Sequence, residues 1–439
     1  MDSSAGLWLH RMKVKHSTLI LILLVLVFLA DGANSILLNM GRDFFKVSIF
    51  FRFVVEAYLL LLLLRSRSGR WVWGLILFFF AVWSFGTLAA SSNPQLYSQG
   101  EYAYFESFKF VNKMLFFFIC WAAFKAVFRS DEERSRLFKV FEWLVIIQSV
   151  VIIASFLFHI ELFAGYSSIQ DGVINRIRFG YRGLIPAENE ISAFFLIAFF
   201  YFLNKVVRHR KGVVQLILIT VAGLLTGTKV SLVLVAVLGF YSIKWLFRVR
   251  IRREHLLLLG SVVLLVVVGV LNLDTLVSRL EPTIQYFTYW VGQKGPLLLF
   301  TTGRDIRLNF VLEEFLPYYN GLNILFGGTD LVKFATEMDV IDVFLKLGFV
   351  GWIAFYFSYI YVLLFSGKGI NFDRLLFVAV WLGVSATAGH LVFSAINGGY
   401  LAILVLAFSV GFQRTGETAT APVHGLHSPI LPVLKNEGL

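Results

Sequence analysis

Long, uninterrupted apolar runs constrain this chain more than any other feature. A helix needs about 20 apolar residues to cross the hydrocarbon core of a bilayer, whereas barrel strands appear as short alternating segments. Hydrophobic residues make up 58% of the 439 residues and charged residues only 15%. A soluble fold of this length could not bury so much apolar surface. We therefore predict an all-α, polytopic membrane protein with about twelve transmembrane helices. The predicted spans are 17–36, 47–64, 71–90, 108–128, 138–158, 190–206, 213–228, 230–247, 255–273, 340–365, 374–393 and 396–412.

The distribution of Lys and Arg supports this count. The formal net charge is +12, but the basic residues stand in short runs between the apolar stretches. Such runs are topology signals, because cytoplasmic loops are enriched in Lys and Arg. Every second predicted loop is basic, as is the first tail. We therefore expect both termini in the cytoplasm and no nucleic-acid partner.

The alternate, outer loops are longer and less basic. The largest, 274–339, contains amphipathic stretches and turn signals, and long loops of this kind tend to be functional. We interpret 1–412 as one transmembrane domain that includes this loop, and 413–439, rich in Thr, Pro, Gly and His, as a disordered cytoplasmic tail.

Arginines on the outer side run against the topological bias and suggest a function. The candidates are Arg176, Arg178, Arg182, Arg279, Arg304 and Arg307. The Arg guanidinium is a rigid fork of donors that matches phosphate oxygens, so two or three that converge could hold a diphosphate. The alternative is pairing with nearby carboxylates at the surface.

An acidic segment precedes the tenth span. Glu337 is followed by Asp339, Asp342 and Lys346, and on a helix the last three share one face. One carboxylate could act as a general base. Alternatively, Asp339 caps the first turn and Asp342 pairs with Lys346. Gly348 and Gly351 are expected to allow close helix packing.

Isolated polar residues provide further candidates. Asn189 begins the sixth span and could cap it or bind sugar hydroxyls. Lys229 follows Thr226-Gly-Thr at an outer turn and could contact an anion, and His390 falls inside the eleventh span. Ionisable residues within the membrane are functional candidates by default. Glu56 and Glu142 are expected to be buried bonding partners. No phosphate-binding loop or metal-spaced His/Cys cluster appears, so neither a cofactor nor a metal is predicted.

Four motifs occur in a telling order. Arg182-Gly-Leu-Ile-Pro-Ala-Glu-Asn189 opens a span, Thr226-Gly-Thr-Lys229 follows at a helix pair, Gly303-Arg304 begins an amphipathic stretch, and an acidic motif leads to Gly348-Phe-Val-Gly351. This order resembles the O-antigen ligase and polymerase superfamily of bacterial inner-membrane proteins. The resemblance covers about 178–351.

The resemblance implies a glycosyltransferase. Such proteins take a glycan linked to undecaprenyl diphosphate and transfer it to a sugar hydroxyl on the periplasmic side, without a metal. It implies that Arg178, Arg182 and Arg304, with Arg307 and Lys229 as further candidates, bind the diphosphate. Glu337, Asp339 or Asp342 would then activate the acceptor. A flippase and a chain-length regulator are candidate partners.

Two departures from the family pattern bear on the reaction. Ligases of this family carry a His-Asn pair where this chain has Glu337-Met338, and the usual Ser-Arg is Thr228-Lys229 here. A carboxylate base suits a polymerase of lipid-linked repeat units in exopolysaccharide, capsule or lipopolysaccharide synthesis. The alternatives are a ligase to a lipid or protein acceptor, a transporter or flippase of lipid-linked sugars, and a membrane subunit without chemistry.

Overall fold

The computed structural model describes most of the chain. The described residues are 15–41, 47–66, 69–93, 95–96, 101–165, 167–170, 173–176, 179–246, 260, 273–295, 303–330, 335–367, 369–389 and 391–410. Arg178, His390, most of the predicted ninth span and the tail from 413 lie outside them.

Eleven of the predicted spans coincide with helices of the described residues. These are α2 (His16–Asn39), α3 (Val47–Leu64), α4 (Gly69–Ser91), α5 (Glu101–Val127), α6 (Asp131–Leu157), α7 (Glu188–His209), α8 (Val213–Leu225), α9 (Lys229–Leu246), α16 (Asp339–Phe365), α17 (Phe372–Ala388) and α18 (Ala395–Val410). Within the described residues, 7 helices are long and apolar enough to cross a membrane, and two shorter apolar helices accompany them. The chain is therefore a multi-pass membrane protein, and the count of twelve stays a prediction.

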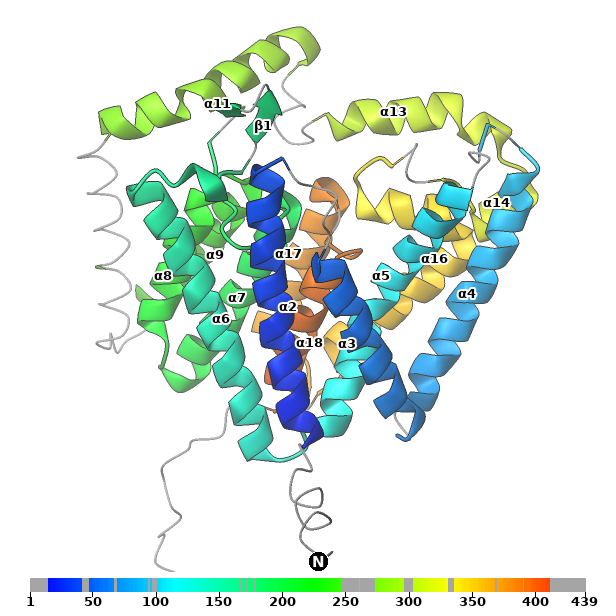
Figure 1. Cartoon of the computed structure of the whole chain (residues 1–439), viewed down its shortest axis with the longest axis horizontal. Helices are drawn as coiled ribbons and strands as arrows, with labels where there is room; N and C mark the ends of the chain where they lie inside the picture. Colours follow the sequence, from blue (N-terminus) through cyan, green and yellow to red (C-terminus); the bar gives the residue numbers. More distant parts are fainter. Residues whose placement is uncertain are drawn as a thin grey trace, which may run out of the picture.

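The helices form a bundle with two distinct ends (Figure 1). Helices α11 (Leu273–Lys294) and α13 (Arg304–Glu314) lie across one end, and α2, the first described helix, begins at the other. We call these the loop end and the N-terminal end. The connections from α3 to α4, α5 to α6 and α7 to α8 all lie at the N-terminal end. The alternation of basic loops therefore corresponds to an alternation between the two ends.

Short elements complete the loop end. They are η1 (Glu161–Phe163), the strands β1 (Ser167–Gln170) and β2 (Val173–Arg176), η2 (Leu316–Tyr318) and α14 (Gly321–Phe326). Short helices lie within 274–339, as expected, and that this segment is a periplasmic loop stays a prediction. The fold is all-α apart from one small hairpin that the sequence analysis did not include. The strands pair antiparallel with Gln170 opposite Val173. Asp171-Gly172 stands between them, and Asp-Gly is a strong hairpin signal that the apolar pattern does not include.

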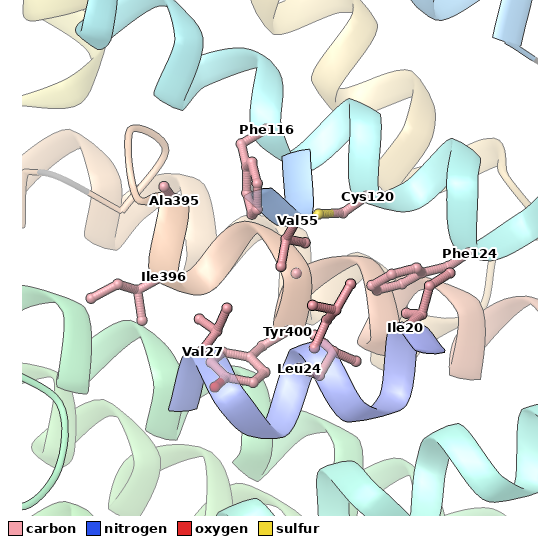
Figure 2. Close-up of a pocket in the computed structure, with 12 residues that line it drawn as sticks. Ile20, Leu24, Val27, Val55, Phe116, Cys120, Phe124, Ala395, Ile396 and Tyr400 are labelled. Atoms are coloured by element: carbon pink, nitrogen blue, oxygen red, sulfur yellow. The ribbon is translucent and has the colours of Figure 1, made fainter. Parts of the chain in front are cut away.

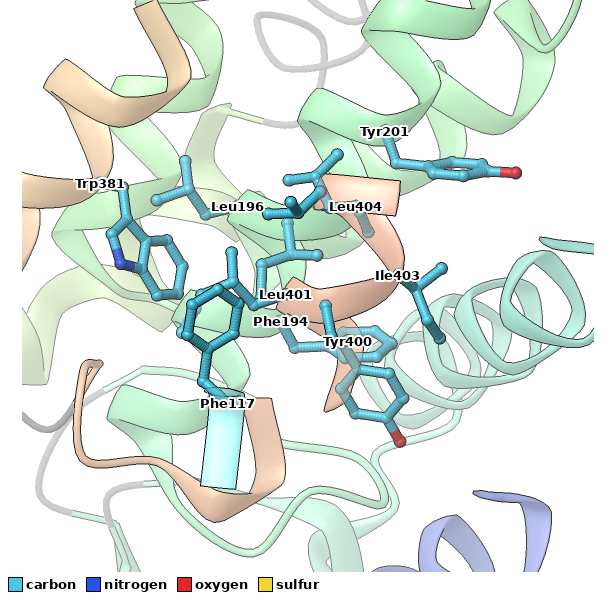
Figure 3. Close-up of a cluster of buried hydrophobic side chains, with 14 of the residues drawn as sticks. Phe117, Phe194, Leu196, Tyr201, Trp381, Tyr400, Leu401, Ile403 and Leu404 are labelled. Atoms are coloured by element: carbon cyan, nitrogen blue, oxygen red, sulfur yellow. The ribbon is translucent and has the colours of Figure 1, made fainter. Parts of the chain in front are cut away.

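Helix α7 lies in the interior of the bundle. Most of its span is buried, as expected for a helix that is apolar on all sides. Phe194 of α7 and Tyr400 of α18 stack edge to face, with ring centroids 5.0 Å apart, inside the aromatic and aliphatic cluster of Figure 3. By contrast, Leu77 and Leu88 of α4 are exposed, which suits a helix that faces lipid.

Four glycines position the loop end on the bundle. Gly327 and Gly328 follow α14, and a Cβ at either would overlap the backbone of Gly348 or of Gly86 in α4. Gly348 itself has φ +62 and interrupts the helical backbone of α16. The carbonyls of Leu345 and Lys346 accept instead from the amides of Thr329 and Gly328, at 3.1 and 3.0 Å. The predicted close packing is confirmed, and it coincides with a break in the membrane helix.

Replacing Gly348 by Ala should destabilise the protein by roughly 1–3 kcal/mol, because the new Cβ overlaps backbone and φ is positive. The measurement is the thermal midpoint of the detergent-solubilised protein. Gly383→Ala is the control, since a Cβ at that α17 position meets nothing within 4 Å. Equal midpoints for the two variants would contradict this account.

Candidate active site

Two arginines and one carboxylate meet at the loop end. Gly303, at φ +84, precedes α13, and Arg304 and Arg307 stand one turn apart at the start of that helix. Glu337 accepts a hydrogen bond from Arg307 and lies 3.5 Å from Nη2 of Arg304. Arg304 also donates to the carbonyl oxygen of Thr387, at 3.2 Å. The structure thus brings together three of the residues predicted from the sequence.

The charges of this cluster are unbalanced. Within these three residues, Arg304 and Arg307 carry two positive charges against the single negative charge of Glu337. Side-chain exposure is 11% for Arg304 and 54% for Arg307. An incoming anion can therefore contact the Arg307 guanidinium directly, and bidentate guanidinium contacts are well suited to phosphate oxygens.

The backbone at Glu337 is held in an uncommon conformation. Its φ is +58, in the left-handed region that side-chain-bearing residues seldom adopt. Gly389, at φ +53, presses against the same residue, because a Cβ there would overlap the carbonyl of Glu337. Sequence reasoning missed Gly389, since 52 residues separate it from its partner and no local pattern marks the contact.

Asp339 fixes the segment that follows α17. It is fully buried, and its Oδ2 accepts from the amides of Leu391 and Val392, both at 2.9 Å. The residue before α16 is Met338, and no side chain caps the helix there. The alternative interpretation of Asp339 as a helix cap is therefore wrong.

Asp342 fixes the segment that precedes Glu337. Its Oδ1 accepts from the amide and the hydroxyl of Thr336, both at 2.8 Å. Lys346 donates instead to Ser107 and to the carbonyl of Thr329, so the predicted pairing with Asp342 is wrong. Asp339 and Asp342 thus anchor the backbone on two sides of Glu337.

Arg182 lies in a buried polar network. Its guanidinium donates to the carbonyls of Pro186 and Ser35 and to Asn39, and lies 4.0 Å from Glu188. Burial lowers the pKa of Arg182, and Glu188 partly opposes that shift. The network fastens the loop before α7 to the end of α2. A role of Arg182 in diphosphate binding stays a prediction.

The turn that contains Lys229 packs against the same loop. Gly227, at φ +66, leaves no room for a Cβ beside the carbonyl of Phe179, and the amide of Tyr181 donates to Leu225 at 3.0 Å. The amide of Phe179 donates to Thr283 of α11 at 2.8 Å. Lys229 begins α9 and is half-buried.

Asn189 is half-buried in the first turn of α7. Helix α17 ends at Ala388, before Gly389 at φ +53. His390 lies outside the described residues, so its place in the eleventh span stays a prediction. Among the residues that the structure describes, no three His, Cys, Asp or Glu side chains are grouped so that they could hold a metal ion.

Comparison with known families identifies the chain. A model of the O-antigen ligase-like membrane proteins matches residues 13–293, which is more than half of the 439 residues. The chain belongs to this family. Neither the curated proteins nor the solved structures contain a match.

The match places this O-antigen ligase-like protein among membrane glycan-processing enzymes. It covers the motifs at Arg182 and Lys229 but ends before Arg304 and Glu337. The arginine–glutamate cluster is therefore a finding of the structure and of the motif order rather than of the family match.

Replacing Asp339 by Leu should destabilise the loop end by roughly 3 kcal/mol, because two buried amides lose their acceptor. The measurement is hydrogen exchange at Leu391 and Val392, which should accelerate strongly. Asp339→Asn keeps one oxygen acceptor and should fall between Leu and wild type. Unchanged exchange in the Leu variant would rule out the anchoring role.

Proposed function

We propose that this protein polymerises undecaprenyl-diphosphate-linked oligosaccharide units at the periplasmic face of the bacterial inner membrane. The cluster of Arg304, Arg307 and Glu337 carries the proposal. It places phosphate-binding groups and a carboxylate beside one another at the end of the bundle opposite the basic loops. The proposal keeps the expectation that both termini lie in the cytoplasm.

The cluster suits a glycosyl transfer. The acceptor hydroxyl oxygen forms a bond to the anomeric carbon of the donor sugar, and the bond from that carbon to the diphosphate oxygen breaks. Glu337 takes the hydroxyl proton, and the departing lipid diphosphate keeps the electron pair and is stabilised by the two guanidinium groups.

The present pairing suggests how substrate would prime the base. Both guanidinium groups now contact the Glu337 carboxylate. A diphosphate that binds Arg307 and Arg304 competes for those donors and leaves the carboxylate free to accept a proton. Substrate binding and activation of the base are then one event.

The carboxylate favours polymerisation over ligation. The resemblance implies a His-Asn pair in the ligases, at the position of Glu337-Met338 here. A ligase to a lipid or protein acceptor remains the second candidate, because the matched family is described as ligase-like. The surface or exopolysaccharide product would require a flippase upstream and a chain-length regulator beside the polymerase.

Deleting the gene should remove long glycan chains and leave single lipid-linked units on the periplasmic side. Gel analysis of surface glycan together with mass spectrometry of extracted lipids is the measurement. Chains of normal length that stay on the carrier lipid would indicate a ligase. Units trapped on the cytoplasmic face would indicate a flippase.

The Arg304→Ala variant should lower glycan transfer at least about a hundredfold, the scale of losing one charge-stabilising donor. Its abundance in the membrane should not change. Arg136→Ala is the matched control, because Arg136 also pairs with a glutamate, Glu132, and is 55% exposed, but lies at the N-terminal end. Wild-type chain lengths in Arg304→Ala would refute the role of that arginine.

A further inference from the structure

A second group of charged residues descends into the bundle from the loop end. Along α5, Glu106, Lys109 and Lys113 stand at spacings of three and four, so they share one face of the helix. At 1.5 Å per residue this face extends about 10 Å along the axis. Lys109 bonds Glu106 at 2.6 Å, and their side chains keep 24% and 19% exposure. The upper part of this face is therefore accessible.

Other helices direct polar groups at this face. Asn112 of α5 donates to Glu56 of α3 at 2.8 Å, and Arg52 of α3 pairs with Asp31 of α2. Lys113 interacts electrostatically with Glu190 of α7 and with Arg52. We call this set the inner polar cluster. Its members are Asp31, Asn34, Arg52, Glu56, Glu106, Lys109, Asn112, Lys113, Glu190 and Asn397.

The cluster contains buried atoms without a hydrogen-bond partner in the described part of the chain. They are Oδ2 of Asp31, Oδ1 of Asn34, Nε of Arg52 and Oδ1 of Asn397. Buried polar atoms in native proteins nearly always have a partner, and each exception asks for an explanation. The four come from three helices around one region. Together they offer three acceptors and one donor.

The charges indicate what kind of ligand would fit. The cluster holds four carboxylates, Asp31, Glu56, Glu106 and Glu190, and three cations, Arg52, Lys109 and Lys113. Carboxylates and cations nearly balance in the cluster, so it has no excess positive charge that would favour an anion such as a diphosphate. Mixed acceptors and donors match hydroxyl groups, which can donate and accept at once.

Aromatic rings border the same region. Phe110 of α5 and Phe393, which precedes Ser394, have ring centroids 4.1 Å apart. Ser394 donates to Glu190 at 3.3 Å, and Asn397 donates to the backbone oxygen of Glu190 at 3.0 Å. Apolar rings beside carboxylates and amides suit a ring with polar edges and an apolar face.

One short segment joins the cluster to the candidate active site. Gly389 presses against Glu337, the amides of Leu391 and Val392 bond Asp339, and Ser394 bonds Glu190. Even fully extended, the five residue-to-residue steps from 389 to 394 span at most about 18 Å. A substrate of several sugar units could contact both places.

A mostly apolar cavity lies close to the cluster. It has a volume of about 30 Å³, stands between α2, α3, α5 and α18 (Figure 2), and is lined among others by Val27, Val55, Phe116 and Ile396. Each of these four residues lies within about one turn of a polar residue of the cluster. Apolar side chains offer no hydrogen bond to a hydroxyl group, so we expect sugar hydroxyls to bind the polar residues and not this cavity.

We propose that the inner polar cluster binds sugar units of the lipid-linked substrate while its diphosphate occupies Arg304 and Arg307. The proposal rests on the proposed function and adds a place for the glycan. In this arrangement the inner polar cluster binds the sugar units, and Arg304 and Arg307 bind the diphosphate of the same substrate molecule.

Binding to two probes tests this assignment. The full-length protein in lipid nanodiscs is titrated with undecaprenyl diphosphate alone and with the glycan-linked form extracted from a strain that lacks the gene. Lys113→Met and Asn397→Ala should bind the glycan-linked form about tenfold more weakly, the scale of one lost charge-assisted hydrogen bond. Their affinity for undecaprenyl diphosphate should match that of wild type.

Glu142→Gln is the control, because Glu142 is also a carboxylate in a membrane helix but bonds Tyr201 and Lys205, outside the cluster. Gel filtration and the thermal midpoint check folding, and Asp31→Asn replaces any variant that fails. Unchanged affinity for both probes would overturn the proposal, and so would an equal loss for both. Arg304→Ala should weaken both probes; if it does not while Lys113→Met does weaken the glycan-linked form, the diphosphate assignment fails and the sugar site stands.

Discussion

An ionised group in hydrocarbon is costly unless it is paired, and the interior of this bundle is organised around that cost. Asp339 is paired with two backbone amides, and Arg374 donates to the carbonyls at the end of α16. Lys346 reaches Ser107 and Thr329. Asp339 and Lys346 tie α16 to segments distant in sequence, and Arg374 ties α17 to the end of α16, the helix before it. The charged groups whose burial in the membrane costs free energy also fix how the helices are arranged.

The kind of bonding partner distinguishes the structural carboxylates of this region from the one proposed to react. Asp339 and Asp342 are buried and accept hydrogen bonds from backbone amides, so they fix the backbone on either side of Glu337. Glu337 itself is 31% exposed and bonded only through side chains in the contacts described, to Arg304 and Arg307. Side-chain partners can be exchanged for substrate groups more readily than backbone partners. Of the three acidic side chains, that of Glu337 is therefore the one whose partners a substrate could replace, which is why the proposed function assigns it the proton.

The sequence predicts the position of a helix well where the thickness of the bilayer sets the length of the apolar run. The span 47–64 coincides with α3 (Val47–Leu64), because apolar length alone sets such boundaries. Glu56 and Glu142, expected to be bonded within the membrane, are bonded to Asn112 and to Tyr201 and Lys205. The hairpin and the break at Gly348 were not predicted, since hydropathy does not encode local backbone angles. The pairing of Glu337 with α13, and the burial of Arg182 against α2, depend on long-range packing that no motif spacing reveals.

The left-handed backbone at position 337 has a consequence for how this fold can diversify. Among residues with side chains, His, Asn and Asp enter that conformation more readily than most. The turn is held from outside, by Thr336 bonded to Asp342 and by Gly389 against the carbonyl of Glu337, and neither contact involves the Glu337 side chain. The backbone contacts therefore do not require a carboxylate at position 337. If residue 337 is the proton acceptor that we propose, a single substitution to His would change that group and leave the contacts that hold the turn in place.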